Sequence, residues 1–436
     1  MVLPITAKTD RSAHLEIGGC DTVELARQYG TPLFVYDEAD IRSQCRAYKQ
    51  AFVSPEIKTR VVYASKAFCS TAICQLVREE GLSVDVSSGG ELYVALRAGF
   101  APGDIYMHGN NKTPAELEMA VAEKVGVIVI DSFDEIDRLT GLLPEGRKQL
   151  VMLRITPGVR PDTHEYIQTG QADSKFGFGL HEDSALAAIA RVQNEPAMEL
   201  IGYHAHIGSQ ISAAGSYVQA VEVITAFAAE ARRQTGFSPE AINFGGGLGI
   251  RYMTRDPNLA IEEYCRAVTH TALARRAELG LEFEEIVIEP GRSIVGRAGV
   301  TLYTVGTVKH IPGVRTYVSV DGGMSDNLRP MLYQARYEAV LANKMGAEPT
   351  GEVTVAGKHC ESGDIIISNA ALPEVRVGDI LCTPATGAYG YAMANNYNKQ
   401  PRPAVVMVAE GSSHVIVKRE TYPDVVRLDV PLMSQE

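Results

Sequence analysis

Short apolar runs alternate with helix-like segments through the first two thirds of the chain. Eight runs rich in β-branched and other apolar residues lie at 60–65, 82–86, 105–107, 127–130, 150–155, 200–206, 241–244 and 286–289. The helix-like segments lie near 39–53, 70–80, 90–98, 114–124, 134–142, 183–194, 216–234 and 258–279. Eight buried strands alternating with helices over about 250 residues are typical of a closed parallel barrel. The pattern therefore predicts an α/β fold with a (β/α)8 TIM-type barrel over residues 38–296.

The pattern changes after residue 297, where strands follow one another with little helix between them. These runs lie at 300–309, 315–321, 351–357, 363–369, 379–383, 403–409 and 412–418, and they predict a C-terminal all-β domain. The run Leu33–Asp37 precedes the barrel pattern, and chain termini are often neighbours in space. We therefore expect residues 1–37 and 297–436 to form one β-rich domain, with a helical insertion at 327–337, that completes the active site.

Composition and charge narrow the class of protein. A chain of 436 residues is too long for one ordinary core, and 45% apolar with 22% charged residues is usual for a globular enzyme. A formal charge of −12 with no basic stripe argues against nucleic acid or an anionic membrane as a partner. No signal-peptide pattern or bilayer-length apolar window is visible, so we expect a cytoplasmic protein.

The seven cysteines show neither a disulfide framework nor metal-type pairs. They are odd in number and scattered along the chain, and Cys69 and Cys74 are too far apart for a metal-binding knuckle. Free thiols in a reducing compartment are the simplest interpretation.

Polar residues and glycines gather at the ends of the predicted barrel strands. Active sites of such barrels lie at the carboxyl ends of the strands. Here those ends carry Lys66, the Asp85–Ser88 turn, His108, Asp131, Arg154, His206, Gly245–Gly247 and Glu289. Packing alone does not explain this concentration, so we expect the active site at this end.

Lys66 follows the first barrel strand directly. A lysine amine at the edge of an apolar core is readily desolvated, which lowers its pKa and makes it a nucleophile toward aldehydes. That is the chemistry of a lysine that binds pyridoxal phosphate. A lysine after a strand is more often a solvated loop residue, so the other motifs have to support this interpretation.

Two loops after the last two barrel strands suit an anionic, flat cofactor. The amides of Gly245–Gly249 can turn together toward a phosphate, although a tight turn alone would also use glycines. Arg292 presents a planar fork suited to phosphate or carboxylate. Glu289 can bind a protonated pyridine nitrogen, which strengthens the ring as an electron sink. The alternative is a structural Glu–Arg ion pair.

His204 and His206 end the sixth barrel strand. The period of two places both on one face, so a zinc site has to be considered. Only His108 is available as a further ligand of that kind, and we expect no metal. We favour stacking of one imidazole on a flat cofactor ring, with the other histidine satisfied in the core.

The β-rich domain offers a carboxylate-binding pair and an acid. Arg329 and Tyr333 are four residues apart and would share a helical face that grips a carboxylate. The Cys360 thiol stands beside Glu361, and an ordinary thiol with a pKa of about 8.5 stays protonated at neutral pH and can donate a proton. A lone cysteine is more often a small buried apolar group. Tyr389 brings a hydroxyl on a flexible turn.

Together these motifs resemble the family of diaminopimelate decarboxylases. They belong to the alanine racemase-like group of pyridoxal phosphate enzymes, which also includes the eukaryotic-type ornithine decarboxylases. The resemblance covers essentially the whole chain and is carried by Tyr63–Lys66, Asp85–Glu91, His206–Gln210, Gly245–Gly247, Glu289–Arg292, Ser325–Pro330, Cys360–Ser362 and Gly387–Tyr389. One departure is Lys358-His359 before Cys360, where the family more often has a proline.

The resemblance implies a role for each residue of these motifs. Lys66 would form the Schiff base with pyridoxal 5'-phosphate, His206 would stack on the ring, and Glu289 would meet the ring nitrogen. Residues implied around the phosphate are Ser209, Gly245, Gly246, Gly247, Pro290, Gly291, Arg292 and Tyr389. Those implied around the amino-acid substrate are Arg292, Arg329, Tyr333, Glu361 and Tyr389. Cys360 would be the proton donor, and Cys360 and Glu361 would act in the site of the other subunit of a homodimer.

The expected reaction is decarboxylation of meso-2,6-diaminopimelate to L-lysine and carbon dioxide, the last step of lysine biosynthesis. A decarboxylase of ornithine, lysine or a carboxylated polyamine is the alternative, but such a substrate would leave Arg329 and Tyr333 without a carboxylate to bind. A catalytically silent regulator would be expected to lose Lys66 or Cys360. A metal-dependent barrel hydrolase is a third possibility.

Overall fold

The computed structural model describes residues 1–159, 174–180 and 184–432, and the chain divides into two compact units. The barrel unit comprises Arg42–Ile250 and Pro257–Ile294. The β-rich unit comprises Met1–Ile41, Arg251–Asp256 and Val295–Glu436. Each is described by itself below. No sequence pattern indicated that the short segment Arg251–Asp256 would leave the barrel for the other unit.

The barrel unit is a closed ring of parallel strands, which confirms the predicted fold class. In ring order its strands are β5 (Lys58–Ala64), β6 (Ser83–Val86), β7 (Ile105–Met107), β8 (Val127–Ile130), β9 (Gln149–Thr156), β11 (Met198–His204), β12 (Ala241–Asn243) and β13 (Glu285–Ile288). Pairing of β13 with β5 closes the ring. A two-residue strand, β10 (Phe178–Gly179), adds to β9. Inside, apolar side chains such as Val62, Met152 and Val287 pack together.

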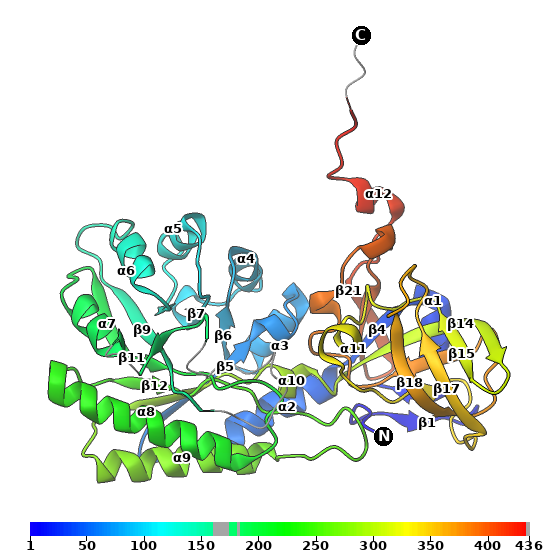
Figure 1. The fold of residues 1–436 in the computed structure, drawn as a ribbon, viewed down its shortest axis with the longest axis horizontal. Helices are drawn as coiled ribbons and strands as arrows, with labels where there is room; N and C mark the ends of the chain where they lie inside the picture. Colours follow the sequence, from blue (N-terminus) through cyan, green and yellow to red (C-terminus); the bar gives the residue numbers. More distant parts are fainter. Residues whose placement is uncertain (160–173, 181–183, 433–436) are drawn as a thin grey trace. The chain divides into compact units, whose positions relative to one another are not determined.

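Helices surround the barrel strands in Figure 1. They are α2 (Glu38–Ala51), α3 (Thr71–Glu79), α4 (Gly89–Arg97), α5 (Pro114–Ala122), α6 (Phe133–Thr140), α7 (Ser184–Gln193), α8 (Ala214–Thr235) and α9 (Ile261–Glu278). Four of them begin at a serine or threonine whose side-chain oxygen accepts a backbone N–H of the first turn, namely Ser70, Ser88, Thr113 and Ser132. These caps fix where each loop ends, and so fix the length of the loops at the carboxyl end of the barrel.

A long strand, β14 (Gly299–Ile311), organises the β-rich unit. It pairs with β4 (Leu33–Asp37), β15 (Arg315–Val320) and β19 (Ile380–Thr383). The remaining strands of this sheet are β16 (Val340–Leu341), β17 (Gly351–Ala356), β18 (Ile365–Leu372), β20 (Ala404–Ala409) and β21 (Ser412–Val417). Strand β4 lies between β14 and β20 and so belongs to this sheet, although it precedes the barrel in the sequence.

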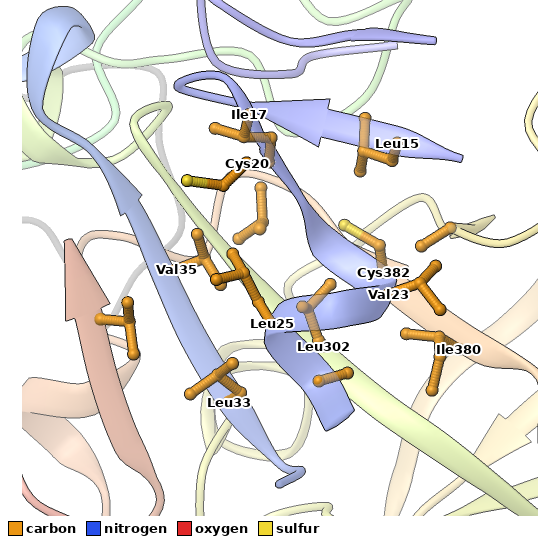
Figure 2. Close-up of a cluster of buried hydrophobic side chains, with 14 of the residues drawn as sticks. Leu15, Ile17, Cys20, Val23, Leu25, Leu33, Val35, Leu302, Ile380 and Cys382 are labelled. Atoms are coloured by element: carbon orange, nitrogen blue, oxygen red, sulfur yellow. The ribbon is translucent and has the colours of Figure 1, made fainter. Parts of the chain in front are cut away.

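The N-terminal residues add elements that the sequence pattern did not predict. These are β1 (Lys8–Thr9), β2 (Leu15–Ile17), β3 (Cys20–Asp21) and helix α1 (Thr22–Tyr29). Figure 2 shows how Leu15 of β2 and Val23 of α1 pack in one cluster with Leu302 of β14 and Ile380 of β19. Strands of two or three residues are too short to show a period. Their apolar side chains are nevertheless fully buried against the sheet.

Three short helices complete the described fold. They are α10 (Arg292–Val295), α11 (Arg329–Tyr333) and α12 (Tyr422–Val426). The predicted helical insertion at 327–337 is thus present but shorter. In the described part of the chain, every helix is too short or too polar to cross a lipid bilayer.

Candidate active site

Lys66 lies at the carboxyl end of β5, as predicted. The strand ends at Ala64, and Lys66 is the middle residue of a 3-10 turn, Ser65–Ala67. The amide of Ala64 donates to the carbonyl of Pro290 over 3.0 Å, so the lysine and the loop after β13 are neighbours. The side chain of Lys66 is exposed, whereas Ser65 and Ala67 are buried. The protein therefore does not enclose the amine to the degree that the sequence suggested.

Two titratable groups lie within electrostatic reach of Lys66. Burial raises the pKa of Asp85, the charge of Glu289 raises it further, and the Lys66 ammonium opposes both. Burial lowers the pKa of His206, and the positive charges of Lys66 and Arg154 lower it further. His206 is therefore a neutral imidazole at pH 7 beside the lysine.

The carboxylate of Glu289 is held by side chains from three other barrel strands. His108 Nε2 lies 2.9 Å from Oε1, His204 Nε2 lies 2.9 Å from Oε2, and the Asn243 side-chain amide donates to Oε1 over 2.7 Å. Burial would raise the pKa of Glu289, but the two histidines outweigh it and hold this pKa well below its ordinary value. Glu289 is therefore an anion at the mouth of the barrel although it is only 7% exposed.

Among the described residues, donors occupy three of the acceptor positions of Glu289 and leave one without a partner. A carboxylate offers about four lone-pair sites, and the three N–H groups occupy three of them. The fourth lies on Oε2, which accepts only from His204 among these donors. A further N–H donor, such as a protonated ring nitrogen, can bind there.

The spacing of His204 and His206 predicted a common face, but the two side chains have different hydrogen-bond partners. Strand β11 ends at His204, so the period of two does not extend to His206. His204 bonds to Glu289 in the core, with its pKa lowered to about 4 mainly by burial. The Nδ1 atom of His206 instead accepts the amide of Gly246 over 3.3 Å. The predicted division into one core histidine and one available imidazole is consistent with this arrangement.

A cluster of possible metal ligands does occur, but it contains Glu289 in place of His206. The ligand atoms of His108, His204 and Glu289 lie within 4.8 Å of one another. Each imidazole nitrogen that points into the cluster already donates to the carboxylate. A metal ion would have to replace both hydrogen bonds, so we interpret the cluster as the support of Glu289.

The glycine loop after β12 is packed too closely for any side chain. A Cβ at Gly246 would meet the carbonyl oxygen of Glu289 at 1.9 Å, and one at Gly247 would meet that of Gly208 at 2.2 Å. Gly247 also has φ of +106°, a conformation that only glycine adopts without strain. The amides of Gly245 and Gly246 already donate to Asn243 and His206. An anion bound by this loop would therefore use amides that begin at Gly247.

Arg292 and Ser209, both predicted around a phosphate, are brought together. Arg292 Nη2 donates to Ser209 Oγ over 2.8 Å, and the arginine is 6% exposed at the start of α10. Gly291, just before it, would place a Cβ 2.8 Å from Ala64. The barrel unit thus gathers a lysine, a carboxylate and an arginine around one end of the ring of strands.

In the β-rich unit, Arg329 lies among tyrosines. Arg329 Nη1 donates to the Tyr337 hydroxyl over 2.6 Å, and its guanidinium carbon lies 4.4 Å from the centre of the Tyr252 ring. Burial alone would lower the pKa of Arg329, but Tyr252, Tyr337 and Tyr389 outweigh it and the pKa is raised. In the described chain Arg329 contacts Tyr252 and Tyr337, whereas Tyr333 is half-buried on the same short helix. The predicted Arg329–Tyr333 grip remains a prediction.

Cys360 and Glu361 lie on an exposed loop between β17 and β18. Both are exposed, and the amide of Cys360 donates to the side-chain oxygen of Asn398 over 2.9 Å. A structural cysteine would be expected in the core, and five of the other six cysteines are buried there, with exposures of 0–8%. Because Cys360 lies on the surface, it does not serve as a small apolar group packed in the core.

Sequence reasoning missed the residues that support the site. From the sequence, His108 is identified only as a strand-end residue and a possible metal ligand, and Asn243 is given no role, yet both bind Glu289. Both could have been proposed as site residues from the sequence, because each lies at the carboxyl end of a predicted barrel strand. Tyr252 and Tyr337, which surround Arg329, had no such signal because they lie in irregular segments.

The chain is similar to known decarboxylases over its whole length. A family described as pyridoxal-dependent decarboxylase, pyridoxal binding domain, matches residues 38–296. The diaminopimelate decarboxylase of Bacillus subtilis is 52% identical over 100% of this chain and 99% of its own. A crystal structure of the diaminopimelate decarboxylase of M. jannaschii with L-lysine superposes with a TM-score of 0.91 at 33% identity, covering 98% of both chains. A lysine/ornithine decarboxylase of Vibrio vulnificus, at a TM-score of 0.74 and 22% identity, shares the fold.

Asp326, three residues before Arg329, predicts a pH dependence of stability. Burial raises its pKa to about 7, although the Tyr303 hydroxyl and the Gly323 amide donate to it. A raised carboxyl pKa stabilises the fold fully below the unfolded value of about 4, and this contribution is lost as pH rises through 7. We expect Asp326→Asn to remove that loss, so its Tm relative to the unsubstituted protein should rise between pH 5 and 8.

Thermal melts at a series of pH values test this expectation. Asp379→Asn is the matched control, because Asp379 in the same unit has a lowered pKa, so its Tm deficit should stay constant between pH 5 and 8 and shrink only below about pH 4. A Tm difference for Asp326→Asn that does not change across this range would contradict the raised pKa.

Proposed function

Because the chain belongs to the pyridoxal-dependent decarboxylases, and within them to the diaminopimelate decarboxylases, we propose that it converts meso-2,6-diaminopimelate to L-lysine and carbon dioxide. The observation that carries this proposal is the ionised Glu289 at the barrel mouth. An anion with one open acceptor position suits a cofactor ring that must keep its nitrogen protonated. Loss of carbon dioxide requires such a ring, because the electrons of the broken bond have to be accommodated.

The residues of the barrel unit fit pyridoxal 5'-phosphate. Lys66 would hold the aldehyde, Glu289 the ring nitrogen, and Arg292 with Ser209 the phosphate. The last pair supports the assignment most directly, since a buried arginine beside a hydroxyl is complementary to an anion. When bound, the cofactor supplies the electron sink of the reaction.

His206 would cover one face of the cofactor ring. Its pKa is held low, so it presents a neutral, flat imidazole rather than a second cation beside Lys66. A neutral ring is important here, because a charged imidazole would oppose protonation of nearby groups. The bond from its Nδ1 atom to the Gly246 amide fixes the orientation of the ring.

Arg329 supports diaminopimelate over other basic amino acids. A buried guanidinium that stays charged binds a distal carboxylate, with Tyr333 and Tyr389 as proposed neighbours. Ornithine or lysine would leave this charge without a partner, and a buried unpaired charge is unfavourable. The L-lysine bound in the relative from M. jannaschii is consistent with the proposed product.

We further propose that the working form is a homodimer with shared active sites. Cys360, as the proton donor, and Glu361, as the group that binds the distal amine, are exposed in their own chain. Exposure of both is what a contribution to a partner subunit requires. A monomer should then be inactive.

The proposed compartment is the cytoplasm. All seven cysteines are free, with no disulfide in the described chain, and Cys360 has to remain a thiol to act as an acid. A reducing compartment maintains this state.

Lys66→Ala tests the cofactor assignment. The purified protein should show a visible absorbance band that borohydride removes while it attaches the cofactor to Lys66, and the variant should lack both properties. Lys58→Ala, at the exposed start of the same strand, is the control and should keep the band. Retention of the band in Lys66→Ala would contradict the assignment.

Arg329→Ala tests the substrate. Loss of a hydrogen-bonded charge pair should raise KM for diaminopimelate about 10- to 100-fold. Arg376→Ala is the control, because Arg376 is exposed and pairs with Glu374 on the surface. An unchanged KM for Arg329→Ala, or equal use of ornithine by the unsubstituted enzyme, would favour the alternative substrates.

Mixing two inactive variants tests the shared site. In dimers that contain one Lys66→Ala chain and one Cys360→Ala chain, one of the two sites is intact if the residues come from different subunits. Random assortment should then restore about one quarter of the activity of the unsubstituted enzyme. Absence of any recovery in dimers shown to be mixed would mean that each site takes both residues from one chain.

A further inference from the structure

Two loops of the β-rich unit meet at the buried carboxylate of Asp364. Its Oδ2 atom accepts the amide of His359 over 2.9 Å and lies 2.8 Å from Nδ1 of the same histidine. Its Oδ1 atom accepts the amide of Met324 over 2.7 Å. Asp364 is 3% exposed and His359 is 8% exposed. One carboxylate thus ties the residue just before Cys360 to the loop after β15.

The backbone packs tightly against the side chains of Asp364 and His359. A Cβ at Gly357 would meet Asp364 Oδ2 at 2.1 Å, and one at Gly323 would meet His359 Nδ1 at 2.7 Å. The His359 ring also stacks on Tyr397, with 5.9 Å between ring centres and 13° between planes. The imidazole is therefore held on its edge by a carboxylate and on its face by an aromatic ring.

The Cys360 thiol, in contrast, is exposed and depends on its backbone for its position. On one side the loop is held by His359. On the other, the Cys360 amide donates to Asn398, whose own backbone has φ of +52°, a strained conformation for a residue other than glycine.

We propose that His359 and Asp364 are positioning residues that hold Cys360 in place for proton delivery. The inference rests on the proposed function, in which Cys360 is the acid. Proton transfer requires the donor within about 2.6–3.2 Å of the acceptor, and a displacement of about 1 Å costs on the order of 100-fold in rate. A thiol presented to a partner subunit from an exposed loop has to obtain this precision from the residues beneath it.

The test measures where the proton goes as well as the rate. With the acid in place, each carbon dioxide released yields one lysine. With a displaced thiol, water would protonate the carbon that lost carbon dioxide, which still gives lysine, or the proton would go to the cofactor carbon bonded to the substrate nitrogen. The second outcome would leave the amino group on the cofactor and give an aldehyde in place of lysine. For Asp364→Asn and His359→Leu we expect kcat to fall about 10- to 100-fold with a smaller change in KM, and lysine formed per carbon dioxide to fall below one.

Conservative and control variants separate positioning from stability. His359→Asn keeps an N–H donor near the place of Nδ1 and should recover most of the lysine yield that His359→Leu loses. Asp379→Asn removes a buried carboxylate that also accepts three N–H donors, from Asn343, Lys344 and Arg376, none of them in the Cys360 loop. It should lower Tm without changing lysine per carbon dioxide. If Asp364→Asn fails to fold, the comparison of His359→Leu with His359→Asn tests the positioning role instead.

Cys360→Ala distinguishes the two ways in which the inference can fail. A Cys360→Ala enzyme that still yields one lysine per carbon dioxide would remove the proposed acid, and with it the proposed function of this residue. A reduced yield in Cys360→Ala, together with an unchanged yield and kcat in His359→Leu and Asp364→Asn, would overturn the positioning role alone.

Discussion

An ionised carboxylate inside a closed ring of strands is the feature on which the rest of the barrel unit depends. Glu289 follows β13, and its N–H donors come from the ends of β7, β11 and β12. A buried carboxylate would ordinarily become neutral, because burial penalises its charge. Only a closed ring brings three distant segments to the same point, so the fold itself maintains the charge that the proposed chemistry needs.

Much of the architecture could be predicted because it depends on period and length. Burial of side chains leaves a pattern of apolar residues within each single segment. That pattern predicted the eight barrel strands, the helices between them and the change to an all-β pattern after residue 297. Elements of two residues, such as β1 and β16, carry no period and were missed. The transfer of Arg251–Asp256 to the β-rich unit is likewise set by tertiary contacts, which no local pattern records.

The site shows the same division between local and non-local information. Lys66, Glu289 and Arg292 could be found from their motifs and from their places after strands. The partners of Glu289 could not be assigned, because a hydrogen bond between His108 and a residue 181 positions later is invisible in the sequence. The histidine spacing misled for a related reason, since a strand that ends at His204 no longer alternates its side chains. For Arg329, the aromatic surroundings came from residues outside any motif.

The packing of Gly246 has a consequence for engineering. A methyl group in place of its α-carbon hydrogen would overlap the main chain of Glu289. Only glycine is therefore small enough to fit between these two turns. In libraries that seek new substrates, even alanine at this position would move the backbone of Glu289, the carboxylate proposed to bind the cofactor. Tolerance to mutation should therefore fall abruptly at this glycine, whichever amino acid the redesigned enzyme is asked to accept.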